Sequence, residues 1–114
     1  MIKGIGTDIT DNNRFKDFIN DSKKIVRLLS SKEIEKFNLI SNDERKIEYM
    51  ASRFAAKEAL FKASNKKFNM NEVSILNDEA GKPFVESEID FNDVYLSIAH
   101  ERQFSIAFVV ITEK

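Results

Sequence analysis

The spacing of hydrophobic and polar positions changes from a strand period to a helical period and back again. Residues 2–9 read as a strand. Helical spacing and cap signals then predict helices over about 13–20, 23–29, 31–39 and 43–65. Strand patterns return at 73–76, 84–86, 94–99 and 104–111, separated by turns at 78–83 and 100–103. This order predicts an α+β fold with one N-terminal strand, a helical block containing one long helix, and a mainly antiparallel sheet.

Two short signals place the starts of helices. Ser30 with Glu33, and Ser41 with Glu44, have the spacing of a capping box, in which the first side chain accepts from the backbone of the second. The second pair opens the longest helical pattern. With 114 residues and no low-complexity linker, the chain is expected to form one domain over residues 1–114.

A carboxylate lies where the long helix should be apolar. On a wheel of about 100° per residue, the apolar residues form one stripe with Glu58 in its middle; they are Ile47, Met50, Ala51, Phe54 and Phe61. A charge on a buried face is costly unless it is paired or binds a metal. One reading is an ion pair between Glu58 and Lys62, one turn later. The other is that Glu58 faces a polar cavity holding a cation, with Lys62 as a point charge for a phosphate.

The first strand has a similar feature. Gly4, Gly6 and Asp8 share one face, and glycines in a strand favour the close approach of another backbone or a ligand. If the long helix packs over the glycines, Asp8 and Glu58 converge, and two carboxylates suit a hard cation such as Mg²⁺. The alternative is tight helix–sheet packing with Asp8 capping the next segment. No glycine-rich phosphate loop of the standard types is present.

Composition limits the chemistry. The chain has no Cys and one His, which excludes disulfides, thiolate nucleophiles and multi-histidine metal sites within one chain. The longest apolar run, residues 106–111, is far shorter than the ~20 residues of a membrane helix. The N-terminal ten residues carry no secretory signal pattern, so we expect a cytoplasmic protein without a membrane partner.

Charge is unevenly distributed. The formal net charge is −1, which argues against a nucleic-acid partner. Residues 44–67 nevertheless carry seven basic and three acidic residues, whereas residues 72–93 carry one basic and seven acidic residues. A basic helix beside two carboxylates suits a small polyanion with a bound cation. A solvated basic face paired with an acidic one is the alternative. His100, expected in a turn, is either solvated or a phosphate or acid–base contact.

Together, three motifs resemble the holo-[acyl-carrier-protein] synthases, a 4′-phosphopantetheinyl transferase family. They are GIGTDI at 4–9, followed by Arg14, ASRFAAKEALFKA at 51–63, and LSIAHE at 96–101. The resemblance covers nearly the whole chain. It implies that 4′-phosphopantetheine passes from coenzyme A to a serine of an apo acyl carrier protein, for fatty acid and lipid synthesis. Adenosine 3′,5′-bisphosphate is the other product.

The resemblance also implies roles for individual residues. Asp8 and Glu58 match the residues that hold Mg²⁺ against the pyrophosphate of coenzyme A, and Lys62 matches a lysine on the transferring phosphate. These three are the expected catalytic residues. Glu58, or a water that it activates, is expected to accept the proton of the carrier serine.

The remaining matches concern substrate binding. Arg53 and His100 match positions that contact coenzyme A phosphates, and Lys62 serves there too. Arg14 matches an arginine that contacts the acidic carrier protein. Short bacterial members are homotrimers with active sites at subunit interfaces, and the same assembly is expected here.

Two departures from the family pattern affect these expectations. A glycine-containing loop usually follows the lysine helix, but residues 64–67 read SNKK. Either the loop that touches coenzyme A differs here, or the added lysines, including Lys66, replace backbone contacts with charge. Ala99 stands where the family usually has Ser or Thr. Two other functions stay open at this point. One is a module that binds coenzyme A or a carrier protein with poor turnover, and the other is an interaction protein whose Glu58–Lys62 pair is structural.

Overall fold

The structure is a computed structural model that describes all residues 1–114. Helices α1 (Ser22–Leu28), α2 (Ser31–Asn38) and α3 (Asp43–Ser64) follow strand β1 (Ile2–Asp11). Strands β2 (Val73–Asn77), β3 (Pro83–Ser87), β4 (Asp93–His100) and β5 (Phe104–Thr112) complete the chain. Two 3-10 turns, Asn12–Phe15 and Met70–Glu72, follow β1 and precede β2. The expected α+β class with a long helix and antiparallel sheets is confirmed.

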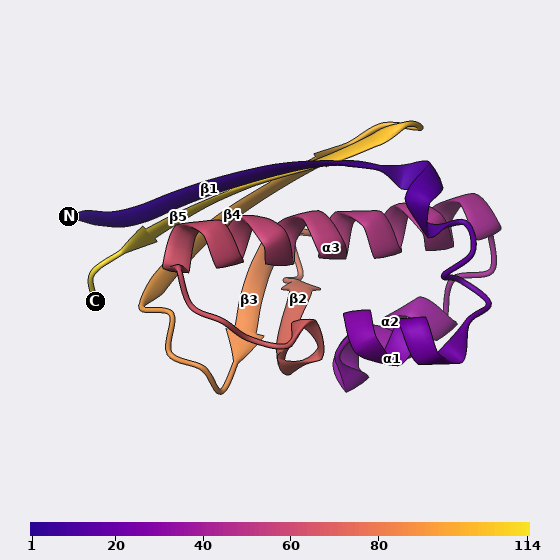
Figure 1. The fold of residues 1–114 in the computed structure, drawn as a ribbon, viewed down its shortest axis with the longest axis horizontal. Helices are drawn as coiled ribbons and strands as arrows, with labels where there is room; N and C mark the ends of the chain where they lie inside the picture. Colours follow the sequence, from indigo (N-terminus) through magenta and orange to yellow (C-terminus); the bar gives the residue numbers. More distant parts are fainter.

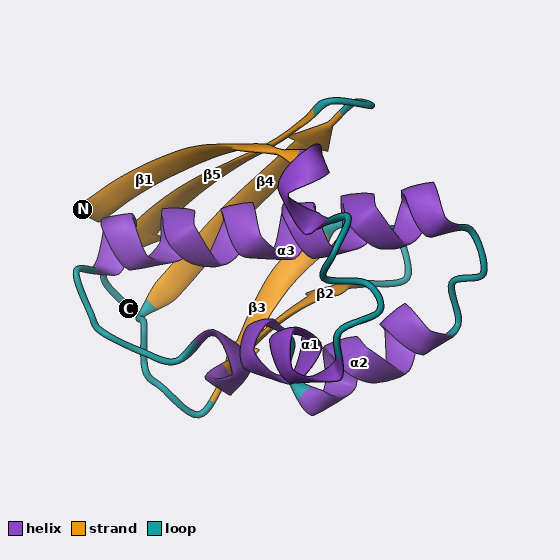
Figure 2. Ribbon diagram, turned by 45° about the vertical axis from the view of Figure 1, so that its right-hand side comes forward, coloured by secondary structure: helices purple, strands orange, loops and turns teal.

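The strands form two antiparallel sheets. In the larger sheet the order is β1-β5-β4, so the last strand lies between the first and the fourth. Strands β2 and β3 form a separate two-stranded sheet. Helix α3 lies between the larger sheet on one side and the α1–α2 pair and the small sheet on the other (Figure 1). Figure 2 shows the same order of layers from a second direction.

The glycines of β1 allow α3 to lie directly against the sheet. A Cβ added at Gly4 would come within 1.9 Å of the carbonyl oxygen of Ala63, and one added at Gly6 within 2.1 Å of that of Ala59. The tight helix–sheet packing considered for these glycines is therefore present. Asp8, two residues further on, does not cap the next segment; Asp11 does, by accepting from Asn13 N–H at 2.9 Å.

Two clusters of buried side chains hold the layers together. One joins the C-terminal half of α3 to both sheets, and its centre is formed by Ala55, Ala59, Leu60, Val73, Ile75, Ala107 and Val109. The other joins the N-terminal half of α3 to α1, α2 and the first 3-10 turn, through Phe15, Ile19, Leu28, Leu29, Phe37, Met50 and Ala51. None of the helices combines the length and the apolar character that spanning a bilayer requires.

The apolar stripe predicted for α3 is correct only for its first half. Met50 and Ala51 are buried, but Phe61 is 41% exposed. In the second half the buried face turns toward the alanines that β1 covers, because the glycines let the sheet approach on that side. The prediction that Glu58 lies in the middle of a continuous core stripe is therefore wrong; its side chain is only half-buried.

The element boundaries agree with the sequence pattern except at three places. The helix expected over 13–20 is a single 3-10 turn at Asn12–Phe15, since buried Asn12 bonds to the β4–β5 hairpin instead of continuing a helix. The side-chain amide of Asn12 donates to Glu101 O at 2.8 Å and to Arg102 O at 3.1 Å. Asn42, not Ser41, caps α3. His100 is the last residue of β4 instead of part of the turn.

Candidate functional site

The first group of polar residues lies between β1 and α3. Asp8 is on the face of β1 that α3 covers, and its side chain is 15% exposed. Lys62 of α3 donates to Thr7 O at 2.9 Å and to Asp8 Oδ1 at 3.3 Å. The buried hydroxyl of Thr10 donates to the other carboxylate oxygen, Asp8 Oδ2, at 2.7 Å. Both oxygens of Asp8 are therefore held, and a cation already rests against one of them.

Glu58 stands one helical turn before Lys62. It forms no ion pair with Lys62, because the ammonium group of Lys62 turns to Asp8. The structural pairing of Glu58 and Lys62 considered from the sequence is therefore absent. Instead, Glu58 lines a small cavity with Lys57 and the apolar side chains of Phe61, Phe68 and Met70. A carboxylate in such a cavity can accept a proton from a group that enters it.

The carboxylates of Asp8 and Glu58 are the groups of this region that could hold a magnesium ion. Asp8 and Glu58 offer carboxylate oxygens, and no group of three or more His, Cys, Asp or Glu side chains surrounds them. Mg²⁺ commonly binds through one or two carboxylates while keeping waters or substrate phosphate oxygens as its other ligands. The ammonium of Lys62 at Asp8 shows that this position accepts positive charge.

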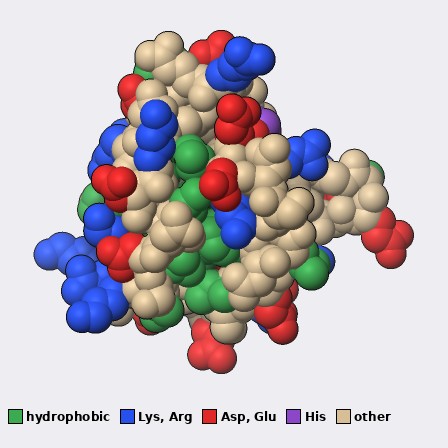
Figure 3. All heavy atoms as spheres, turned by 90° about the vertical axis from the view of Figure 1, so that its right-hand side faces the viewer, with side chains coloured by type: hydrophobic (Ala, Val, Ile, Leu, Met, Phe, Trp, Pro, Cys, Tyr) green, Lys and Arg blue, Asp and Glu red, His purple; other side chains and the backbone are tan.

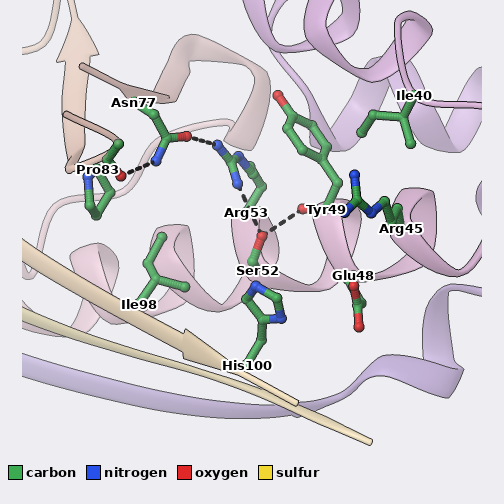
Figure 4. Close-up of a pocket in the computed structure, with 11 residues that line it drawn as sticks. Ile40, Arg45, Glu48, Tyr49, Ser52, Arg53, Asn77, Pro83, Ile98 and His100 are labelled. Atoms are coloured by element: carbon green, nitrogen blue, oxygen red, sulfur yellow. Dashed lines mark hydrogen bonds between the residues drawn. The ribbon is translucent and has the colours of Figure 1, made fainter. Parts of the chain in front are cut away.

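A second polar site lies at the other edge of the larger sheet. It is a cavity of about 490 Å³ between the first half of α3, the β2–β3 turn and the end of β4. Arg53 and His100, predicted as phosphate contacts, both line it, and Arg45 adds a third basic side chain (Figure 4). Its other walls include Tyr49, Asn77 and Pro83. Arg45, Tyr49 and Asn77 were not singled out from the sequence, because their proximity depends on the packing of the small sheet.

The two polar sites lie on either side of α3. In the sheet order β1-β5-β4, Asp8 of β1 pairs with Ala107 of β5, which pairs with Ile98 of β4. Ala107 is fully buried under α3. Asp8 is therefore separated from the cavity that Ile98 and His100 line by two strand spacings, about 10 Å, and by the helix. Ala99 points to the opposite face of β4 from His100, so its missing hydroxyl does not bear on this cavity.

Arg14 is exposed on the first 3-10 turn, and α3 fixes its position. Its guanidinium group lies 4.8 Å from the ring centre of Phe54 and 5.6 Å from that of Phe15. Phe54 is one helical turn before Glu58, so Arg14 stands beside the first polar site. Exposed Lys16 of the following turn adds to the basic side chains of this end. Figure 3 views this end of the molecule and shows Lys and Arg side chains around its rim, with acidic groups between them.

Residues 64–67 contain no glycine, yet they include the left-handed backbone conformation that glycine favours. Asn65 ends α3 in the left-handed region at φ 55°, a conformation that Asn tolerates better than most residues. Lys66 does not extend into either polar site. Its ammonium group donates to Asp90 O and lies 5.9 Å from the ring centre of Phe91. A role for Lys66 in binding coenzyme A would require it to leave this contact.

A fully buried ion pair was not foreseen from the sequence. Lys57 donates to Glu33 Oε1 at 2.5 Å, to Leu28 O at 2.7 Å and to Met70 O at 2.9 Å. Burial lowers the pKa of Lys57, and the charge of Glu33 opposes that shift. Glu33 Oε2 also accepts from Ile75 N–H at 2.8 Å. Two signals were present: the capping-box position of Glu33, and a lysine among four alanines at 55, 56, 59 and 63.

Comparison with known proteins gives one consistent result. Residues 4–109 match the model of the family described as the 4′-phosphopantetheinyl transferase superfamily. The chain is 34% identical to the holo-[acyl-carrier-protein] synthase of Petrotoga mobilis, covering 100% of this chain and 99% of the relative. It is 40% identical to that of Acholeplasma laidlawii, with the same coverage.

Among solved structures, a holo-(acyl-carrier-protein) synthase from Bacillus anthracis, in complex with CoA (3′,5′-ADP), is similar with a TM-score of 0.90 and 33% identity. The match covers 100% of this chain and 99% of that one. A synthase from Neisseria meningitidis matches with a TM-score of 0.88 and 29% identity, covering 99% of this chain and 100% of that one.

Proposed function

This chain belongs to the 4′-phosphopantetheinyl transferase superfamily and transfers 4′-phosphopantetheine from coenzyme A to an apo acyl carrier protein; we propose that Asp8, Glu58 and Lys62 form the site of transfer. The observation that carries this proposal is the contact of Lys62 with Asp8, one turn from Glu58. The product, holo carrier protein, serves fatty acid and lipid synthesis. The cysteine-free sequence agrees with a cytoplasmic location.

The reaction joins the serine oxygen of the carrier to the phosphorus that bears pantetheine. The bond between the two phosphates of coenzyme A breaks, and adenosine 3′,5′-bisphosphate leaves. Glu58 takes the proton of the serine hydroxyl at its carboxylate. Lys62, which already lies over Asp8, binds the transferring phosphate and neutralises part of its charge.

Asp8 and Glu58 would hold Mg²⁺, which when bound neutralises the pyrophosphate and makes the phosphorus more electrophilic. Thr10 keeps Asp8 oriented for this task through its 2.7 Å hydrogen bond. With a phosphate in place, Lys62 exchanges its contact with Asp8 for one with the phosphate. The residues of the chain therefore position the pyrophosphate and remove the proton.

The test of the transfer site is an assay with coenzyme A, Mg²⁺ and an apo carrier protein, read by mass spectrometry of the carrier. We expect the carrier to gain the mass of one phosphopantetheine group. Glu58→Gln and Asp8→Asn should abolish that gain while the variants keep the wild-type circular dichroism spectrum. Glu44→Gln, on an exposed residue in the first turn of the same helix, is the control. Near-normal activity of either variant with Mg²⁺ would contradict the assignment of these carboxylates as metal ligands.

The carrier is proposed to dock beside Arg14. This residue is exposed, held against Phe54, and next to the helical turn that carries Glu58. Acyl carrier proteins are acidic, so basic side chains at this end of the enzyme speed association with the carrier, and the effect weakens as the salt concentration rises. Arg14→Ala should raise KM for the carrier with little change in KM for coenzyme A. An equal effect on both substrates would exclude a docking role.

The active enzyme is proposed to be a homotrimer whose sites are shared between copies. The cavity lined by Arg53 and His100 and the contact of Asp8 with Lys62 lie on different sides of α3, so one coenzyme A molecule would reach both more readily across an interface than within one chain. The outer face of the larger sheet supplies an apolar surface for such an interface. Its exposed side chains are Ile5, Ile9, Tyr95, Ile106 and Phe108.

Mixing two inactive variants tests the shared site. In assemblies formed from equal amounts of Glu58→Gln and Arg53→Ala chains, sites that combine Glu58 of one chain with Arg53 of another are intact. Random mixing should then restore roughly a quarter of wild-type activity at low coenzyme A concentration. Activity no greater than the sum of the separate variants would show that each chain builds its own site.

A further inference from the structure

The guanidinium group of Arg53 is fixed before any ligand arrives. Nε donates to Ile75 O at 3.2 Å, Nη1 to Ser52 Oγ at 3.2 Å, and Nη2 to Asn77 Oδ1 at 2.8 Å (Figure 4). A guanidinium group has five N–H donors. Three are used by the protein, and two remain for a ligand in the cavity.

The ring of Tyr49 packs against the guanidinium group. The carbon at the centre of that group lies 4.1 Å from the ring centre of Tyr49. The hydroxyl of Tyr49 donates to Glu33 O at 3.1 Å, and Ser52 Oγ donates to Tyr49 O at 2.9 Å. The ring is thus held by α2. The aromatic face attracts the cation, and this contact further limits the movement of the guanidinium group.

Asn77 holds the other side of the group and connects it to the β2–β3 turn. Its side-chain nitrogen donates to Gly81 O at 3.0 Å while its oxygen accepts from Arg53. Because both ends of the amide are bonded, its orientation is defined. Asn77 is otherwise exposed, so its side chain contributes little to the core. Its contacts serve the position of Arg53.

The side chains around the guanidinium group of Arg53 favour an anionic ligand. Arg45 and His100 line the same cavity, and Glu48 is its one acidic residue. Coenzyme A carries phosphate at two separate places, the pyrophosphate and the 3′-position of the ribose. If the pyrophosphate lies at Lys62, as proposed above, the phosphate left for Arg53 is the 3′-phosphate.

We propose that Tyr49 and Asn77 are positioning residues that hold Arg53 for the 3′-phosphate, and that they set the preference of the enzyme for coenzyme A over 3′-dephospho-coenzyme A. This inference rests on the proposed function. It adds two residues that do not touch the reacting atoms and act only through Arg53. Their effect is therefore confined to substrates that carry the 3′-phosphate.

The experiment measures kcat and KM with coenzyme A and with 3′-dephospho-coenzyme A. For Asn77→Ala and Tyr49→Leu we expect kcat/KM for coenzyme A to fall roughly tenfold, mainly through KM. The value for 3′-dephospho-coenzyme A should stay within about twofold, because Arg53 has no phosphate to bind there. Tyr49→Phe keeps the aromatic ring against Arg53, so this variant should keep most of the preference for coenzyme A over 3′-dephospho-coenzyme A. Asn38→Ala, on the exposed end of α2, is the matched control.

A binding measurement without turnover separates the possible outcomes. By calorimetry, wild-type protein should bind adenosine 3′,5′-bisphosphate more tightly than 5′-AMP, and Asn77→Ala should lose most of that difference. Equal losses with both coenzyme A substrates would mean that Tyr49 and Asn77 are only structural and would overturn the proposal, as would no loss at all. If wild-type protein binds both nucleotides as expected but modifies no carrier, the proposed function fails and the positioning role stands.

Discussion

Tyr49 is a titratable reporter of the cavity that Arg53 lines. The chain has two tyrosines and no tryptophan, so Tyr95→Phe leaves Tyr49 as the only phenol. Burial raises the pKa of Tyr49 from 10.0 to about 12, partly opposed by the charge of Arg53. An absorbance titration of the Tyr95→Phe protein, followed by circular dichroism to confirm that it stays folded, should show this value. A midpoint near 10.0 in the folded protein would contradict the packing of Tyr49 against α2 and Arg53.

The same shift predicts how stability depends on pH. The folded protein keeps the Tyr49 proton between pH 10.0 and about 12, whereas the unfolded chain loses it. The free energy of unfolding should therefore fall as the pH rises through this range. Tyr49→Phe lacks the titrating group, so denaturation curves of this variant should show a smaller decrease over the same range. Identical decreases in the two proteins would assign the pH dependence to other groups.

Removing one partner of the buried ion pair is expected to lower the free energy of unfolding more than most single substitutions do. Lys57→Met leaves the carboxylate of Glu33 buried without its partner, and such losses cost about 3–5 kcal/mol. Urea denaturation should show this decrease. Lys32→Met, which removes an exposed pair with Glu86, should cost less than about 1 kcal/mol. Similar values for the two variants would show that water reaches Lys57.

For individual residues, the sequence predicts candidate charged site residues, but it does not predict which of them form ion pairs with one another. The strand pattern, the helical wheel and the family resemblance point to Asp8 and Lys62 as candidate site residues, and the structure brings them together. The helical wheel did not predict the ion pair of Lys57 with Glu33, because a wheel assigns one buried face to the whole of α3. The helix is buried on different sides along its length, and only the tertiary packing decides where each side lies.

At the scale of elements, the contact between β1 and α3 determines the geometry of the proposed transfer site. Gly6→Ala would place a methyl group within 2.1 Å of Ala59 O and 2.8 Å of Ala63 N, which are backbone atoms that cannot rotate away. We expect a loss of about 1–3 kcal/mol or more in the free energy of unfolding. Lys3→Ala, on the exposed face of the same strand, should stay within about 0.5 kcal/mol. A stable Gly6→Ala protein with wild-type activity would contradict this contact.

Most elements followed from local signals, and the exceptions have local causes. The capping box of Ser30 and Glu33 marked the start of α2, and both of its hydrogen bonds are present. The helix expected over 13–20 depended on cap residues alone. There Asn12 bonds to carbonyl groups of residues 101 and 102, nearly ninety positions away, and no local pattern could reveal that competitor.

For the whole molecule, the outer face of the larger sheet is the surface proposed for assembly. Phe108 is 44% exposed on the central strand, amid other apolar side chains. Phe108→Asp should shift the protein from trimer to monomer in analytical ultracentrifugation, because a charge in an apolar interface is costly. Carrier modification should fall with it, since the proposed sites are shared. Wild-type mass and activity in this variant would place the interface elsewhere. Glu79→Gln, in the exposed β2–β3 turn, is the control.

The sheet order has a consequence for how the chain reaches its fold. The middle strand β5 is the last strand of the sequence, and its pairing of Asp8 with Ala107 joins residues about a hundred positions apart. Such distant contacts make folding slow, because the loop must close before the pairing stabilises it. During synthesis β1 and β4 therefore emerge without their shared partner and expose unpaired strand edges until residue 104 and those after it arrive. Aggregation of the nascent chain should be most severe in this interval and should end when β5 is added.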